Sequence, residues 1–252
     1  MDAAIHLLNY CATHPDATIR FHSSDMILHI HSDASYLSVH GARSRVGGYF
    51  FLSQHPPSLG YNANTPAPPF NGPVHVNSII LQHVMSSAAE AELGALFHNA
   101  KDAETLRTVL IAMGHPQPAT PIQTDNACAN GIVNDTVKQK RSRAMDMRFY
   151  WVRDRVRQGH FLVFWAPGDI NIADYYTKHF AVSHHRSIRS TVLHNPSTSS
   201  VMQGCVDLPQ RQHSCLAHDP QSPMTVSASA ISSTPVHLDP DDSLHRIAHN
   251  LL

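Results

Sequence analysis

Apolar and polar residues alternate in the first third of the chain in a way that predicts three strands. Residues 25–36, 45–53 and 74–85 are rich in β-branched and aromatic residues, as is typical of strands. Residues 54–72, between the second and third strands, are rich in Pro, Asn and Gly. Because proline cannot donate to a strand ladder, we expect these residues to form a long hairpin loop.

Helical spacing of the apolar residues follows the third strand. Ser86 or Ser87 is suited to cap a helix that runs through Ala100, and a second helical pattern covers residues 103–113. The other predicted elements are helices at 127–133, 137–158 and 171–180 and strands at 121–124 and 159–166. Residues 3–13 are expected to form either a short helix or an incoming linker. This order predicts an α/β fold with a five-stranded mixed sheet, its first three strands antiparallel, flanked by helices.

Composition changes near residue 180. The chain has 252 residues, of which 42% are hydrophobic and 15% charged, enough for one folded domain and a tail. Residues 181–252 are rich in Ser, Pro, His and Thr and contain no Lys, so we predict a low-complexity, mostly disordered tail with a short helix at 243–252. The folded domain is expected at 25–180, preceded by a connecting segment at 1–24.

Cysteine spacing and hydropathy exclude several classes of protein. The four cysteines form no CxxC pair, which argues against a zinc ribbon and a disulfide framework. Cys205 and Cys215 lie near His213 and His218, but this spacing fits no familiar metal site. There is no run of 18 apolar residues, so we expect no membrane span or signal peptide. The expected location is intracellular, in the cytoplasm or nucleus.

Four carboxylates lie at the edges of predicted elements. Asp33 is in the C-terminal half of the first strand, and Glu92 is early in the long helix. Asp125 follows the strand at 121–124, and Asp174 begins the last helix. A single Asp at a strand end is more often a turn former, but four converging carboxylates are suited to hold two Mg²⁺ ions for a displacement at phosphorus.

The stretch at 137–158 is the most charged part of the chain. Between Lys138 and Gln158 there are eight basic residues and two acidic ones. Its apolar residues recur at helical spacing, which predicts an amphipathic helix with a basic outer face. A charge run is usually a solvated face, but this excess of one sign, in a chain of net charge −1, favours a surface for a polyanion.

Five segments in order resemble the ribonuclease H domain of the reverse transcriptase polyprotein of copia-type LTR retrotransposons. The likeness extends over roughly residues 1–185, and residues 1–24 resemble the connection to an upstream polymerase. The matching segments are HSDASY at 31–36, SSAAEAELGAL at 86–96, QTDN at 123–126, RAMDMRFYWVRDRVRQGHF at 143–161 and NIADYYTKHF at 171–180.

The resemblance implies a ribonuclease H-like fold and Mg²⁺-dependent cleavage of the RNA strand of RNA/DNA hybrids by a two-metal mechanism, with Mn²⁺ able to substitute. It implies an RNA/DNA hybrid as substrate and an upstream reverse transcriptase domain as a candidate partner. The residues implied by position are Asp33, Glu92, Asp125 and Asp174 as catalytic metal ligands and Ser35, Asn126, Arg143, Arg148 and Arg153 as nucleic-acid contacts.

Glu90 competes with Glu92 for the second ligand position. The Leu-Gly-Ala-Leu that follows Glu92 reproduces the context of the catalytic Glu in the family, and a position in the first helical turn explains Glu90 better.

The chain departs from the family in one respect. Many ribonucleases H carry a histidine in the loop before the last Asp, whereas residues 166–173 contain none. This difference bears on turnover rather than on the metal site.

Two other functions stay open. One is a catalytically inactive, transposon-derived module that binds hybrids or other partners. The other is another nuclease or an integrase of the same fold.

Overall fold

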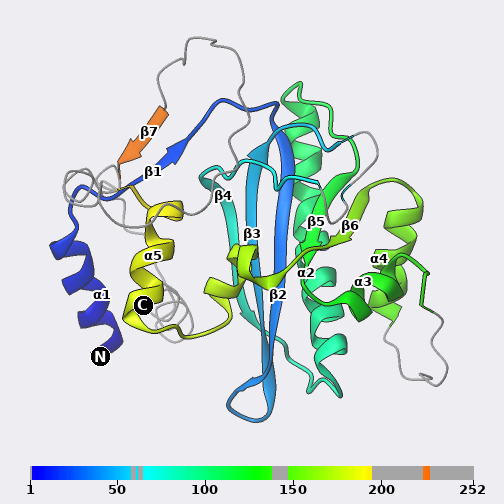
Figure 1. Ribbon diagram of the computed structural model, residues 1–252, viewed down its shortest axis with the longest axis horizontal. Coiled ribbons are helices and arrows are strands. Elements are labelled where there is room, and N and C mark those ends of the chain that lie inside the picture. The colour runs from blue at the N-terminus through cyan, green and yellow to red at the C-terminus, as the bar shows by residue number, and fades with distance from the viewer. Residues whose placement is uncertain (1, 58–60, 62–64, 138–146, 195–223, 228–252) are drawn as a thin grey trace, which may run out of the picture. The chain divides into compact units, whose positions relative to one another are not determined.

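The chain forms two compact units, which are described separately. One comprises residues 24–180, and the other is formed by residues 1–23 and 181–251. The computed structural model (Figure 1) describes residues 2–57, 61, 65–137, 147–194 and 224–227.

A five-stranded mixed sheet forms the centre of the 24–180 unit. The strand order is β4-β3-β2-β5-β6. Strand β3 pairs antiparallel with both β2 and β4, and β5 pairs parallel with both β2 and β6. The predicted α/β class, with the first three strands of this sheet antiparallel, is thus confirmed. The strands are β2 (Ile27–Val39), β3 (Arg43–Ser53), β4 (Pro73–Ile80), β5 (Thr120–Thr124) and β6 (Phe161–Trp165).

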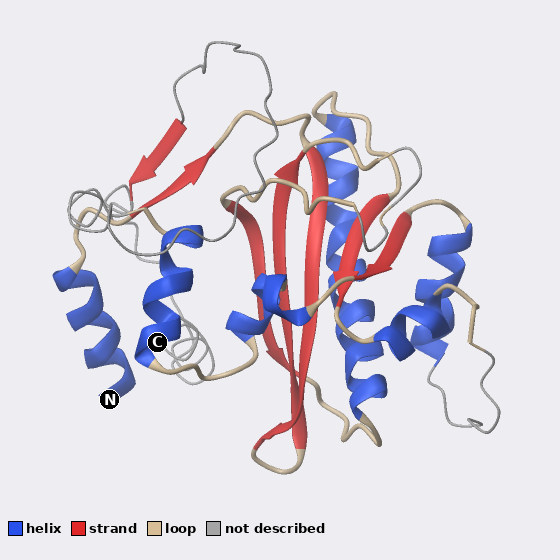
Figure 2. Cartoon of the chain, viewed as in Figure 1, coloured by secondary structure: helices blue, strands red, loops and turns tan. Residues whose placement is uncertain are grey.

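Helices cover one face of this sheet and bury its main core. The strands contribute Leu28, Ile30 and Ile122 to this core, and the helices contribute Leu96 and Val152. Figure 2 shows the longest helix, α2, behind the sheet and short helical turns in front of it. The helices of this unit are α2 (Ala88–Ala112), α3 (Ala127–Val133) and α4 (Met147–Arg157), and the turns are η1 (Gly168–Ile170) and η2 (Ile172–Tyr176).

Two predicted helical segments differ from the structure. The patterns before and after Ala100 belong to one helix, α2, because nothing breaks the chain before Gly114, whose φ of +91° ends the helical region. The predicted helix at 171–180 is the short 3₁₀ turn η2 instead, and the Asn171 side chain caps it by accepting from the Ala173 amide at 3.1 Å.

The second unit contains structure that the sequence did not predict. Strand β1 (Thr18–Phe21) pairs antiparallel with β7 (Met224–Ser227), and helix α1 (Asp2–Thr13) matches the helical alternative for residues 3–13. The prediction of disorder was wrong for α5 (Val182–Val192). The partly buried side of α5 combines Ile188 and Val192 with His185 and Arg189, and two apolar residues in this Ser- and His-rich stretch are too few to predict a helix. The predicted helix at 243–252 lies outside the described residues.

The described part of the chain contains no candidate for a membrane-spanning helix. No helix there combines the length and the hydropathy needed to cross a bilayer.

Candidate metal centre

Strand β2 separates core residues from the residues of the site. Side chains alternate between the two faces of a strand, so Leu28 and Ile30 enter the core while His31 and Asp33 lie on the opposite face. Asp33 is 1% exposed, and its neighbour across the antiparallel ladder is Gly47. The sheet therefore holds this carboxylate in a nearly solvent-free position.

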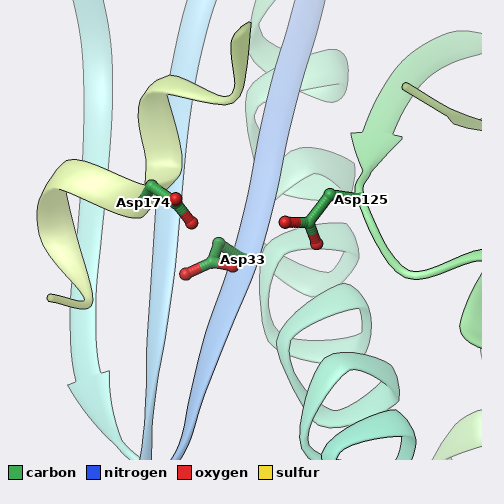
Figure 3. A group of neighbouring side chains, drawn as sticks. All are labelled: Asp33, Asp125 and Asp174. Atoms are coloured by element: carbon green, nitrogen blue, oxygen red, sulfur yellow. The ribbon is translucent and has the colours of Figure 1, made fainter. Parts of the chain in front are cut away.

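Three aspartates from distant parts of the chain meet at this face. Asp33, Asp125 and Asp174 each offer one carboxylate oxygen, and these atoms all lie within 4.8 Å of one another. Figure 3 shows the three carboxylates pointing toward one another from β2, the end of β5 and η2. Asp33 and Asp125 come together because β2 and β5 are adjacent and parallel, with His31 opposite Gln123.

Glu92 approaches the same place from α2. It is 5% exposed, and its Oε1 accepts a hydrogen bond of 3.2 Å from the amide of Ala34, next to Asp33. Glu90 points elsewhere, because two residues along a helix turn a side chain by about 200°. The Glu90 carboxylate accepts from the Ser86 amide at 2.6 Å, which makes it a helix cap and leaves Glu92 beside the aspartates.

The electrostatics of these carboxylates indicate a cation site. Burial, followed by repulsion from Asp33 and Asp125, raises the pKa of Glu92 to about 9. Burial, followed by repulsion from Asp174, raises the pKa of Asp33 to about 7. Burial also raises the pKa of Asp125. Isolated buried negative charges are costly, and a bound divalent cation would offset that cost.

Two carboxylate oxygens have the surroundings expected of metal ligands. Asp33 Oδ1 and Glu92 Oε2 are buried and accept no hydrogen bond from the described residues. Buried polar atoms normally have partners, and hard cations such as Mg²⁺ bind carboxylate oxygens. The donor set therefore fits a divalent metal.

Two further residues, which the sequence analysis missed, complete the surroundings of Asp33. The Thr177 hydroxyl donates to Asp33 Oδ2. The Lys178 ammonium lies 2.6 Å from Asp174 Oδ1 and 3.6 Å from Asp33 Oδ1. The only signal in the sequence was their position three and four residues after Asp174, which in a helical turn places them near it.

Two glycines allow the chain to approach these carboxylates closely. A Cβ at Gly47 would lie 2.5 Å from the carbonyl oxygen of Ala173, so Gly47 lets η2 reach the sheet. A Cβ at Gly168 would lie 2.8 Å from Asp125 Oδ2. The structure therefore shows a tight approach of η2 to β3 at Gly47.

The position of Asp125 is supported from β6 as well. The Trp165 indole donates a hydrogen bond of 2.9 Å to the carbonyl oxygen of Asp125. Trp165 lies at the end of β6 and is 42% exposed, so it presents an aromatic side chain beside the carboxylates.

Three of the five predicted nucleic-acid contacts, Ser35, Asn126 and Arg153, have hydrogen-bond partners within the protein. Ser35 Oγ lies 2.5 Å from Ser38 Oγ, and the Asn126 side chain caps α3 by accepting from the Ala129 amide at 2.9 Å. The Arg153 guanidinium donates to the carbonyl oxygen of Ile132 at 2.6 Å and pairs with Asp135 at 3.1 Å.

Arg143 lies outside the described residues, as does the side chain of Arg148. The role of Arg143, Arg148 and Arg153 in hybrid binding stays a prediction.

No protein-family model and no curated protein matches the chain. Solved structures that match it include LC11-RNase H1, isolated from compost by a metagenomic approach, at 14% identity and a TM-score of 0.43, covering 60% of this chain and 93% of that chain. The same protein in complex with an RNA/DNA hybrid matches at 14% identity and a TM-score of 0.41, with the same coverage.

A second match is the N-terminal RNase H domain of a Mycobacterium tuberculosis protein, at 13% identity and a TM-score of 0.40, covering 60% of this chain and 91% of that chain. The function of this chain is accordingly inferred from its motifs and its carboxylates.

Proposed function

We propose that this chain is a ribonuclease H that uses Mg²⁺ to cut the RNA strand of RNA/DNA hybrids. The supporting observation is the convergence of Asp33, Asp125 and Asp174 within 4.8 Å, although they come from three separate elements. Glu92, buried beside them on α2, supplies the fourth carboxylate. These are the four residues that the motifs assign to the metal site.

The four carboxylates would hold two Mg²⁺ ions, and Mn²⁺ could replace them. Bound in this way, a pair of ions stabilises the attacking and leaving oxygens of an in-line displacement at phosphorus. The donors are all carboxylate oxygens, and two of them are buried without a hydrogen-bond donor among the described residues.

The residues around the carboxylates would serve to fix their orientation. Thr177 holds one oxygen of Asp33, and the Ala34 amide holds one oxygen of Glu92. The Trp165 indole holds the backbone carbonyl of Asp125, and Gly168 leaves room for its carboxylate. Groups held in place before the reaction lower its barrier because little reorganisation is then needed.

The hybrid would bind across the carboxylates and the basic helix. Ser35 and Asn126 directly neighbour the site, where they are suited to contact 2′-hydroxyls or phosphates. Arg143, Arg148 and Arg153 would bind the phosphate backbone, which is how basic side chains add affinity without reading sequence.

The cellular context is also part of the proposal. The order of the five motifs supports an origin in a copia-type retrotransposon polyprotein, with residues 1–24 joining residues 25–180 to an upstream reverse transcriptase domain. Such a domain would act inside the cell, in the cytoplasm or nucleus.

The deciding experiment is cleavage of a hybrid with a labelled RNA strand in the presence of Mg²⁺. Asp33→Asn and Glu92→Gln should each lower the rate at least about a hundredfold, because each removes a charged ligand from the metals. Glu90→Gln is the matched control: it changes the same residue type two positions away on the same helix and should keep near wild-type activity.

The other functions predict different results. A folded wild-type chain that binds the hybrid but does not cut it with Mg²⁺ or Mn²⁺ would be the inactive binding module. A preference for the ends of duplex DNA would instead indicate an integrase or another nuclease of this fold.

A further inference from the structure

Lys178 lies among the carboxylates that would bind the metal. Its ammonium is 2.6 Å from Asp174 Oδ1 and 3.6 Å from Asp33 Oδ1. Its side chain is 41% exposed, whereas that of Asp33 is 1% exposed. The lysine therefore reaches from the surface and brings a positive charge to a buried acidic group.

The balance of interactions keeps this ammonium charged. Burial opposes its charged form, but the hydrogen bond to Asp174 and the charges of Asp33, Asp174 and Asp125 outweigh burial and raise the pKa of Lys178. Lys178 is the only cation for which an ion pair with these carboxylates is found among the described residues.

The neighbouring residue ties the same segment to Asp33. The Thr177 hydroxyl donates to Asp33 Oδ2 and lies 3.1 Å from the Asp174 carbonyl oxygen. The short segment from Asp174 to Lys178 thus carries a carboxylate, a donor to a second carboxylate and a cation that faces both.

We propose that Lys178 is the internal counterion of the metal-free site and that a divalent ion binding to Asp33 and Asp174 displaces its ammonium. This inference rests on the proposed function, since it needs the same carboxylates to bind a metal. Lys178 is a positioning residue in this view: it stabilises the empty site and weakens metal binding by competing for the same oxygens.

Metal affinity tests the competition directly. Removing a positive charge that lies 2.6 and 3.6 Å from two ligand oxygens strengthens the attraction of a divalent ion. Lys178→Met should therefore bind Mn²⁺ about tenfold more tightly than the wild-type chain in calorimetric titration. Lys178→Arg keeps the charge and should stay within about threefold of wild type. Lys101→Met, on the exposed side of α2, is the matched control and should change nothing.

A gain in affinity separates this role from a structural one, because damage to the fold would weaken binding. Asp33→Asn supplies the baseline without the site. If Lys178→Met binds Mn²⁺ no more tightly than wild type while Asp33→Asn abolishes binding, the counterion proposal is wrong and the metal site stands. If neither wild type nor Lys178→Met binds Mn²⁺ above that baseline, both proposals fail.

Chemical labelling reports the displacement itself. The chain has four lysines, at 101, 138, 140 and 178, so acetylation by a short pulse of reagent can be followed at each one by mass spectrometry. With Mn²⁺, the labelling rate of Lys178 relative to Lys101 should rise several-fold, because the ammonium leaves its carboxylate partners. An unchanged ratio on metal binding would contradict the displacement.

Discussion

Asp33 shows how neighbouring groups determine the chemistry of one side chain. Because side chains alternate between the two faces of β2, Asp33 lies on the face opposite the core. Burial raises the pKa of Asp33 to about 7. The Thr177 hydroxyl and the Lys178 charge act in the opposite direction and favour the ionised form. Asp33 is therefore poised between protonated and ionised states near neutral pH, and a metal would select the ionised one.

The raised pKa values predict how pH affects stability without metal. The pKa values of Asp33 and Glu92 are about 7 and 9 in the folded protein, whereas an unfolded chain has values near 4. At pH values between the unfolded and the folded pKa, the folded protein holds protons that the unfolded chain has released. The free energy of unfolding should therefore fall as pH rises from about 4 to 9. Thermal melting in chelator from pH 5 to 9 measures this trend.

Glu92→Gln isolates the contribution of one group to that trend. The amide stays neutral and can still accept from Ala34, so the variant should melt several degrees above wild type at pH 8 and close to it near pH 4. Saturating Mn²⁺ should reverse the order at pH 8, because metal binding stabilises the wild-type chain. A difference in melting temperature between variant and wild type that does not depend on pH would exclude this explanation.

The hydroxyl of Thr177 has its own test. Thr177→Val keeps the shape of the side chain but removes the donor to Asp33, and a hydrogen bond to a charged group is worth about 1.5 kcal/mol or more. We expect about tenfold weaker Mn²⁺ binding in calorimetry. Thr177→Ser retains the hydroxyl and should bind Mn²⁺ nearly as well as wild type; equal losses in both variants would point to packing.

Residues that carry a motif could be predicted from the sequence, and residues that support them could not. Asp33, Asp125 and Asp174 each lie in or next to a predicted element within a recognisable motif, and the structure brings them together. Thr177 acts on a residue 144 positions away, and no local pattern encodes that pairing.

At the scale of elements, two consecutive glycines on β3 bring a helix and a turn to opposite faces of the sheet. A Cβ on Gly47 would meet Ala173 and Thr177, and a Cβ on Gly48 would meet the Asn99 side chain of α2. Asn99 in turn donates to the carbonyl oxygen of Gly47 at 2.9 Å. Close approach on both faces is what allows α2 and η2 to bring their carboxylates to Asp33.

Gly47→Ala should therefore displace η2. The new methyl group would lie 2.5 Å from the Ala173 oxygen and 2.6 Å from Thr177 Cγ2, and such overpacking typically costs about 2 kcal/mol. Because η2 carries Asp174, we expect Mn²⁺ binding to fall at least about tenfold along with the melting temperature.

Gly114→Ala provides the control for lost stability alone. Gly114 has a φ of +91°, and a Cβ there would contact nothing within 4 Å, so the variant should be strained yet bind Mn²⁺ normally. Equal losses of Mn²⁺ affinity in both variants would show that Gly47 acts only through overall stability.

Elements with a clear period were the easier ones to predict. The strands of the central sheet were all expected, because each contains β-branched, aromatic or other apolar residues and lies between turn residues or helices. Strand β1 has four residues and pairs with β7, whose partner positions are about 200 residues away. Helix α5 has only Ile188 and Val192 as apolar residues on its partly buried side, beside His185 and Arg189, so its sequence resembles that of a solvated segment.

At the scale of the whole molecule, the candidate site belongs to one of the two units. Ala34, Thr177 and Lys178, the partners described for Asp33, Glu92 and Asp174, all lie within residues 24–180. A protein consisting of residues 24–180 should therefore fold and bind Mn²⁺ within about twofold of the full chain. Circular dichroism and calorimetry check this, with Asp33→Asn in the same fragment as the control.

A fragment that folds but loses Mn²⁺ binding would show that residues of the other unit contribute to the site. A fragment that does not fold would contradict the division of the chain into these units.

The order of the elements along the chain has a consequence for protein synthesis. Asp33 emerges from the ribosome early, whereas Thr177, its hydrogen-bond donor 144 positions later, emerges only after every strand of the central sheet. Domains tend to fold as units during translation, so the site can form only after the segment that carries Asp174 and Thr177 has joined the sheet. A product of premature termination before Asp174 would thus carry three of the four acids and an incomplete candidate site.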